Sequence, residues 1–208
     1  MTTLEDLAGL EGLTPVETCE LLYTLAGDVP AGESIVEIGT YMGKTACYLA
    51  AGAQAGNGAH VWTVDPHDLP GYRTTTGRQP GTIDFTRTEI RETAERQIRE
   101  AGHADHVTMI HDFSVEAAKS WTGPPVGLLF IDGDHRQHAA RLDFRTWQPH
   151  LSWDAVIAWD DYAPSHPGVP AAARGMVEKG VITEPTMYGR VAITQLVPPA
   201  LRKMRDRQ

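Results

Sequence analysis

The fold is decided by Val36-Glu37-Ile38-Gly39-Thr40-Tyr41-Met42-Gly43-Lys44-Thr45. In this stretch an apolar, β-branched run stops at an acidic residue and passes directly into a turn with two glycines. Glycine lets the backbone turn sharply and approach a ligand that a Cβ would exclude. A helix that begins near Gly43 directs its free N–H groups at whatever lies above the strand. The stretch therefore predicts a strand, a ligand-binding turn and a helix in succession.

A carboxylate stands beside this turn. The negative charge of Glu37 would repel a pyrophosphate and attract a cationic amino or sulfonium group, so the turn favours S-adenosylmethionine as the cofactor. The glycines form neither G-x-G-x-x-G nor G-x-x-x-x-G-K-[ST], and the spacing taken alone is equally consistent with a plain tight turn. The candidate cofactor-binding residues of the turn are Glu37, Gly39, Thr40, Tyr41 and Gly43.

Length, charge and cysteine content narrow the class of protein. A chain of 208 residues fits one domain over 1–208. No apolar run approaches the ~20 residues that span a bilayer, and the first residues lack a secretory pattern, so we expect a cytoplasmic protein without a membrane partner. A net charge of −9 disfavours nucleic acid as a partner, which leaves a small molecule; a homo-oligomer stays open. Cys19 and Cys47 form no C-x-x-C, which argues against a disulfide framework or a thiolate zinc site.

Strand-like and helix-like patterns alternate along the chain. Thr14-Pro15-Val16-Glu17 predicts a helix start with a hydroxyl cap and a capping-box glutamate, in an N-terminal helical extension over about 1–30. Further strands and helices are expected at 34–38, 61–65, 107–111, 126–131 and 155–159, and at 43–55, 86–101, 114–121 and 136–149. This alternation predicts an α/β domain with a Rossmann-like, doubly wound, mostly parallel sheet.

Two further features modify this plan. Val181-Ile182-Thr183 and Val191-Ala192-Ile193 flank a turn-rich stretch with Gly189, which predicts a C-terminal antiparallel hairpin. The Gly- and Pro-rich residues 66–85 form a lid-like insertion, and 163–169 are expected to form a second loop over the same edge.

Carboxylates follow every strand of the expected parallel sheet. A solvated loop explains any one of them, but in an open α/β sheet the carboxyl ends of parallel strands share one rim, where ligands bind. The sequence therefore predicts a site at that rim. The residues concerned are Glu37, Asp65, Asp112, Asp132 and the pair Asp160-Asp161.

Through Glu37-x-Gly39, Asp65 and the closing hairpin, residues 30–196 resemble the class I S-adenosylmethionine-dependent methyltransferases. The resemblance implies that Gly39 passes under the methionine part of the cofactor and that Asp65 accepts hydrogen bonds from the ribose hydroxyls. It also implies that Asp112 or Ser114 touches the adenine edge and that Phe113 offers it an apolar face. An alternative stays open, in which Phe113 belongs to the core and Ser114 caps the next helix.

A second pair of segments carries a narrower resemblance. Ile131-Asp132-Gly133-Asp134-His135 and Trp159-Asp160-Asp161-Tyr162 resemble the divalent-metal-dependent O-methyltransferases of the catechol and caffeoyl-coenzyme A type, and more closely the sugar O-methyltransferases of macrolide and aminocoumarin pathways. The resemblance implies a metal triad of Asp132, Asp160 and Asp161, with Asp132 also beside the cofactor. Asp161 replaces the asparagine of the catechol type, which favours the sugar-modifying branch. Converging carboxylates repel one another, and a hard divalent ion, Mg²⁺ first, cancels that repulsion.

The catalytic base is expected at the same place. His135 stands where the catechol-type family has a lysine base, so the hypothesis is that His135 or Asp132 removes the proton of a substrate hydroxyl. The alternative is that His135 only caps the helix that follows it. The candidate substrate residues are Tyr41, His67, Tyr72, Tyr162 and His166.

The two resemblances, together with the acidic rim, imply a Mg²⁺-assisted O-methyltransferase of a small hydroxylated molecule, a sugar or catechol-like compound of specialised metabolism. Two alternatives stay open: a metal-independent methyltransferase and a catalytically silent protein that binds S-adenosylmethionine as a partner subunit. A nicotinamide dehydrogenase is disfavoured because the glycine fingerprint is missing. The acceptor and its reacting position are not given by the sequence.

Overall fold

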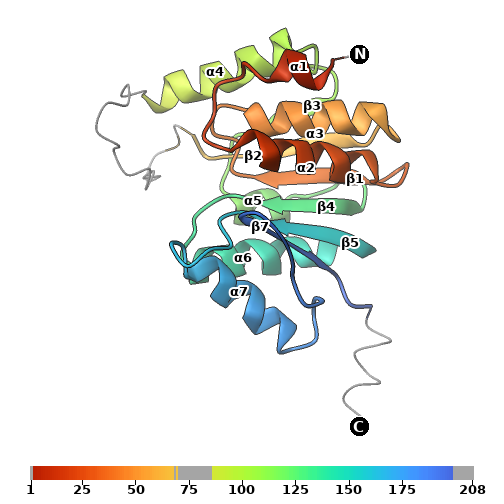
Figure 1. The fold of residues 1–208 in the computed structure, drawn as a ribbon, viewed down its shortest axis with the longest axis vertical. Helices are drawn as coiled ribbons and strands as arrows, with labels where there is room; N and C mark the ends of the chain where they lie inside the picture. Colours follow the sequence, from red (N-terminus) through yellow and green to blue (C-terminus); the bar gives the residue numbers. More distant parts are fainter. Residues whose placement is uncertain (1, 68, 70–85, 199–208) are drawn as a thin grey trace.

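A computed structural model of the chain describes residues 2–67, 69 and 86–198, and contains a seven-stranded sheet of order β3-β2-β1-β4-β5-β7-β6 (Figure 1). Strands β1 to β5 run parallel, and β7 lies antiparallel to both β5 and β6. This confirms the doubly wound, mostly parallel sheet with a closing antiparallel hairpin. The strands are β1 Ser34–Ile38, β2 His60–Val64, β3 Val107–Ile110, β4 Val126–Ile131, β5 Leu151–Trp159, β6 Thr186–Tyr188 and β7 Val191–Gln195.

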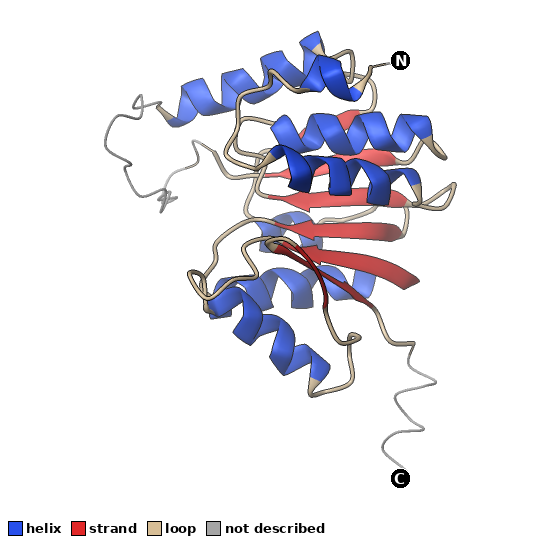
Figure 2. Ribbon diagram, viewed as in Figure 1, coloured by secondary structure: helices blue, strands red, loops and turns tan. Residues whose placement is uncertain are grey.

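Helices cover both faces of the sheet (Figure 2). Because successive side chains of a strand point to opposite faces, Ile35 of β1 joins one apolar cluster and Val36 the other. The first cluster packs the sheet against α2 and α3, and the second packs it against α6 and α7. The helices are α1 Leu4–Leu7, α2 Val16–Gly27, α3 Lys44–Ala55, α4 Arg87–Glu100, α5 Ser114–Lys119, α6 Gln137–Trp147 and α7 Gly168–Val177, with a short 3₁₀ turn at Gln148–His150.

The strand order reverses between β1 and β4. These two strands are neighbours, and from them the sheet grows outward in opposite directions, through β2 and β3 on one side and β5 on the other. Such a reversal opens a crevice beyond the carboxyl ends of the two strands, because their connections leave toward opposite faces. The turn at Gly39 and the segment at Asp132 meet there, since the Asp132 N–H donates to the Ile38 carbonyl over 2.8 Å.

Three local predictions need correction. The hairpin uses 186–188 instead of 181–183, because the N–H groups of Gly180 and Val181 donate to the last turn of α7, and Ile182 keeps one isolated bridge. The expected loop at 163–169 runs into a helix at Gly168. Pro15 is the N-cap of α2 and has no side-chain cap in the described chain; the carbonyl of Thr14 instead accepts from Lys44 Nζ over 2.9 Å.

The N-terminal extension folds onto its own chain. Leu7 of α1 is fully buried, and the Thr2 hydroxyl donates to the Ala101 carbonyl at the end of α4. Of the expected insertion 66–85, only 66, 67 and 69 belong to the described residues, so Tyr72 lies outside them. Among the described helices, none is both long and apolar enough to cross a membrane.

Candidate functional site

The turn after β1 depends on its glycines. Gly39 has φ +99°, and a Cβ there would lie 2.2 Å from the carbonyl oxygen of Asp132. Gly43 has φ +82°, and a Cβ there would lie 3.1 Å from Cα of Ala94 in α4. Tyr41, between them, also adopts a left-handed backbone with φ 46°. The two glycines therefore let the turn pack directly against Asp132 and α4, which a side chain at 39 or 43 would prevent.

Glu37 lies in the interior of the sheet, below this turn. Its side chain is fully buried, and Oε2 accepts a hydrogen bond from the Thr63 hydroxyl, which also contacts the Thr40 hydroxyl. Burial raises the pKa of Glu37 to about 7, although the neighbouring hydroxyls of Thr45 and Thr63 oppose the shift. Oε1 has no hydrogen-bond partner among the described residues. The sequence predicted a fixed negative charge, whereas the structure gives a group that titrates near neutral pH.

Asp65 stands at the end of β2, opposite the turn. Its Oδ2 accepts from the Tyr41 N–H at 3.0 Å and its Oδ1 from the His67 N–H at 2.8 Å. These two bonds fix the carboxylate while each oxygen keeps a free lone pair. His67 is buried, with Nε2 3.0 Å from the Tyr41 carbonyl, so it packs under the turn and presents little surface to a substrate.

The segment after β3 contradicts the alternative in which Phe113 belongs to the core and Ser114 caps the next helix. Phe113 is 40% exposed and forms the N-cap of α5, so it is not a core residue. Ser114 is the first residue of α5, and its hydroxyl accepts from Trp147 Nε1 at 3.1 Å instead of capping the helix. Asp112 Oδ1 accepts from the N–H of Phe113. The segment thus presents an aromatic face at the rim while Ser114 anchors it to α6.

The acidic residues of β4 and β5 come together as predicted from their strand ends. Asp160 is 1% exposed and Asp161 7% exposed, and the N–H of Asp160 donates to the Ile131 carbonyl beside Asp132. Burial, reinforced by the neighbouring charge of Asp160, raises the pKa of Asp132 well above its usual range. Burial also raises the pKa of Asp160, against the pull of Arg190.

The sequence analysis missed Arg190. This residue precedes β7, and its Nη2 lies 2.9 Å from Asp160 Oδ2 and also pairs with Asp161 Oδ1. The guanidinium therefore neutralises one oxygen of each of two predicted metal ligands. No motif marks it, because Arg190 reaches the rim only through the antiparallel pairing of β7 with β5.

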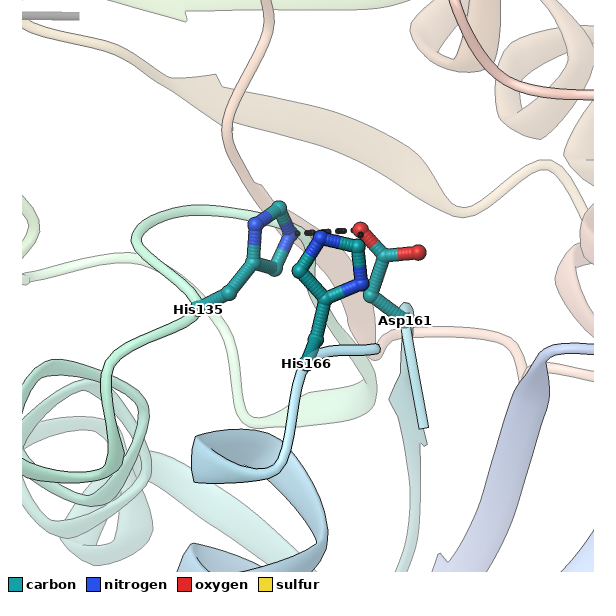
Figure 3. Close-up of side chains that lie close together, drawn as sticks. All are labelled: His135, Asp161 and His166. Atoms are coloured by element: carbon teal, nitrogen blue, oxygen red, sulfur yellow. Dashed lines mark ion pairs between the residues drawn. The ribbon is translucent and has the colours of Figure 1, made fainter. Parts of the chain in front are cut away.

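The imidazoles of His135 and His166 both point toward the carboxylate of Asp161 (Figure 3). His135 Nε2 lies 3.2 Å from Asp161 Oδ2 and 3.6 Å from Asp132 Oδ1, and His166 Nδ1 lies 3.4 Å from Asp161 Oδ2. The N-cap of α6 is Arg136, which shows that the helix-cap interpretation of His135 is wrong. Tyr162, the next residue along the chain, is half-buried, and its N–H donates to the Arg190 carbonyl.

The described side chains whose ligand atoms lie close enough together to share one cation are His135, Asp161 and His166, with these atoms within 4.8 Å of one another. The predicted triad of Asp132, Asp160 and Asp161 does not form such a group, although Asp160 Oδ1 is buried without a hydrogen-bond partner in the described part of the chain. Oxygen donors of this kind suit Mg²⁺ or Mn²⁺. Because Arg190 engages the other oxygen of Asp160, the free Oδ1 is the acceptor left for an ion.

The comparisons with known proteins agree with this geometry. A family model described as a methyltransferase domain matches residues 36–162, which is more than half of the chain and runs from the glycine turn to the end of the acidic rim. The chain belongs to this methyltransferase family.

Solved O-methyltransferases share the fold of this methyltransferase domain. One is an enzyme from Bacillus cereus in complex with SAH, with 18% identity, a TM-score of 0.63, and coverage of 93% of this chain and 90% of that one. Another is TomG from Streptomyces achromogenes, involved in tomaymycin synthesis and in complex with SAM, with 20% identity, a TM-score of 0.61, and coverage of 89% and 82%. A third is CalS11, a TDP-rhamnose 3′-O-methyltransferase of calicheamicin biosynthesis, with 15% identity, a TM-score of 0.59, and coverage of 86% and 76%.

Proposed function

We propose that the protein is an S-adenosylmethionine-dependent O-methyltransferase that acts on a small hydroxylated molecule with the help of a divalent cation. The observation that carries the proposal is the direct contact between the glycine turn and the acidic rim, where a Cβ on Gly39 would collide with the carbonyl oxygen of Asp132. A cofactor over the turn and a hydroxyl at the rim would therefore be neighbours at the switch point of the sheet.

Each residue has a role in this proposal. Asp65, held by two backbone N–H groups, accepts hydrogen bonds from the ribose hydroxyls, and the exposed face of Phe113 packs against adenine. Asp132, Asp160 and Asp161 would hold the cation. When bound, the cation would act as a Lewis acid and lower the pKa of the substrate hydroxyl. His135 or Asp132, 3.6 Å apart, accepts the proton of that hydroxyl.

Methyl transfer needs the accepting oxygen, the methyl carbon and the sulfur on one line. Residues that fix both partners contribute up to roughly 7–11 kcal/mol by positioning alone. The SAM and SAH named for the solved structures of similar fold support the choice of cofactor, and the TDP-rhamnose enzyme among them supports a sugar as acceptor. A compound with adjacent hydroxyls would suit the cation.

A second candidate is a methyltransferase that uses no metal. Arg190 favours it, because the guanidinium already neutralises an oxygen of both Asp160 and Asp161 and so removes part of the repulsion that would attract an ion. The substrate hydroxyl would then be oriented by Asp132 and His135 alone.

Calorimetric titration tests the cofactor. We expect the full chain to bind S-adenosylmethionine and S-adenosylhomocysteine but not NAD⁺. Asp65→Ala should weaken binding at least tenfold, because charge-assisted hydrogen bonds contribute on the order of 1.5–3 kcal/mol each. Asp105→Ala, an exposed carboxylate before β3, is the matched control and should bind as the wild type. Tight NAD⁺ binding, or an unaffected Asp65→Ala variant, would contradict the assignment.

A panel of small diols and sugars, incubated with the protein and S-adenosylmethionine, tests the reaction. Mass spectrometry should detect one added methyl group on an acceptor oxygen. A chelator should abolish the reaction and a divalent ion should restore it. Turnover that is indifferent to the chelator would favour the metal-independent candidate.

A further inference from the structure

We infer that His135, Asp161 and His166 form a binding site for a first-row transition ion, and that this site takes such an ion in preference to Mg²⁺. The inference rests on the proposed function and deepens it, because it names the ion at the rim and gives it two imidazole ligands in place of Asp132 and Asp160. Ion binding itself does not depend on methyl transfer, so the two proposals can fail separately.

The distances between the ligand atoms match an ion between them. Ligands about 2.0–2.2 Å from a metal in a tetrahedral or octahedral arrangement lie on the order of 3.0–3.5 Å from one another. The two nitrogens lie 3.2 and 3.4 Å from Asp161 Oδ2, and all three ligand atoms lie within 4.8 Å of each other. In the described chain, His135 Nε2 is buried and makes no contact with hydrogen-bond geometry, so the protein alone leaves it unsatisfied.

The two oxygens of Asp161 have separate partners. Oδ1 pairs with Arg190, and Oδ2 faces the two imidazoles. An ion at Oδ2 therefore needs no displacement of the guanidinium. An ion held by Asp132, Asp160 and Asp161 alone would share two of its ligands with Arg190, which repels it.

The backbone around the imidazoles fixes their approach. A Cβ on Gly168 would lie 2.3 Å from the His135 carbonyl oxygen, so the first turn of α7 packs directly on the loop that carries His135. The two rings are 4.8 Å apart between centroids, and their side chains are 31% and 39% exposed, which leaves open positions for a substrate. The exposed Ser165 hydroxyl, 3.2 Å from His166 Nδ1, can rotate away.

The ligand types decide which ion the site prefers. Mg²⁺ favours oxygen and keeps several waters, whereas imidazole suits Zn²⁺, Fe²⁺, Co²⁺ or Ni²⁺. Two histidines and a carboxylate with open positions form a facial set that transition ions accept. With His135 Nε2 engaged on the ion, the proton acceptor in the proposed reaction is Asp132.

Cobalt provides a readout that is independent of activity. The chelator-treated full chain should bind one Co²⁺ ion, and the visible d–d absorption of the bound ion measures this affinity. The affinity for Co²⁺ should be at least tenfold higher than the affinity for Mg²⁺ measured by calorimetry. His135→Ala and His166→Ala should each lower Co²⁺ affinity at least tenfold and leave Mg²⁺ binding nearly unchanged. His138→Ala, exposed and one turn further on α6, is the matched control and should leave both affinities unchanged. Metal-free thermal unfolding verifies that each variant is folded.

The result that overturns the inference is equally definite. Co²⁺ binding no tighter than Mg²⁺ binding, or a His166→Ala variant with wild-type Co²⁺ affinity, would remove the imidazole site. A larger loss in Asp160→Asn than in Asp161→Asn would assign the ion to the acidic triad instead. If Co²⁺ binds as expected but S-adenosylmethionine does not, the proposed function fails and the metal site stands. If methyl transfer occurs but no transition ion binds, the metal site fails and the proposed function stands.

Discussion

Gly39 is the residue where the cofactor turn and the acidic rim touch. Gly39→Ala should lower the free energy of unfolding by clearly more than the about 1–3 kcal/mol of a left-handed backbone, because the new Cβ would also collide with Asp132. Gly32→Ala is the matched control, since its φ is +85° but nothing lies within 4 Å of the added Cβ. Urea unfolding measures both, and equal losses would show that the contact with Asp132 is unimportant.

Glu37 makes stability depend on pH. Its pKa in the folded state is about 7, above the ordinary 4.5, so ionisation of the buried carboxyl lowers the stability of the fold. This loss is absent below pH 4.5, grows between pH 4.5 and pH 7, and is complete above pH 7. Glu37→Gln removes this loss. Its stability relative to the wild type should therefore rise between pH 5 and pH 8 by about 3 kcal/mol at most, since one pKa unit corresponds to about 1.4 kcal/mol. Exposed Glu116→Gln should show no such trend in urea unfolding, and a flat difference for Glu37→Gln would contradict the shift.

At the scale of elements, α4 joins the N-terminal segment to the cofactor turn. Gln97 is buried, exchanges two hydrogen bonds with the backbone of Glu11, and donates to the Met42 carbonyl at 2.7 Å. Gln97→Leu should cost a few kcal/mol of stability, because each unsatisfied buried group costs about 1–3 kcal/mol, and should weaken S-adenosylhomocysteine binding in calorimetry. Arg96→Leu, which loses exposed ion pairs to the side chains of Glu11 and Glu100, should change either quantity little. Similar effects of both variants would contradict the role of the buried amide.

The closing hairpin supplies a cation to the rim. Arg190→Met leaves Asp160 without its counter-charge, so stability should fall, though by less than the about 3–5 kcal/mol of a fully buried pair, because Arg190 is 34% exposed. The loss should be larger at pH 8 than at pH 5, since burial raises the pKa of Asp160 and a protonated carboxyl needs no cation. Arg136→Met breaks an exposed pair with Asp134 and should change stability little at either pH. Urea unfolding at the two pH values tests this, and a loss independent of pH would argue against the pair.

At the scale of the whole molecule, the cofactor would bridge the two halves of the sheet on either side of the β1–β4 contact. A ligand that binds only the folded state at one hundred times its Kd adds about 2.7 kcal/mol. S-adenosylhomocysteine at that level should therefore raise the Tm by about 5–10 °C for a chain of this size. NAD⁺ should have no effect, and Asp65→Ala should lose the shift at the same concentration. An unchanged Tm for the wild type would count against the shared cofactor site.

Much of the fold follows from local patterns. The alternation of apolar strands with helical periodicity predicts parallel strands, and parallel strands place their carboxyl ends at one rim, so Asp132, Asp160 and Asp161 were expected to converge. The helix at Gly168–Val177 was not predicted, because Pro167 and Pro170 flank its first turn and prolines at this spacing are typical of a loop. The boundaries of the hairpin were not predicted, because the last turn of α7 engages residues 180 and 181.

The sequence by itself determined the α/β sheet, the glycine turn and the acidic rim, because these depend on periodicity, backbone conformation and strand direction, which neighbouring residues encode. Only the tertiary structure decided which side chains face those carboxylates. Arg190 reaches Asp160 and Asp161 through the pairing of β7 with β5, and His166 reaches His135 because α7 packs against the loop after β4. Such contacts join segments that are distant in the chain, and their geometry depends on packing, so no local spacing encodes them.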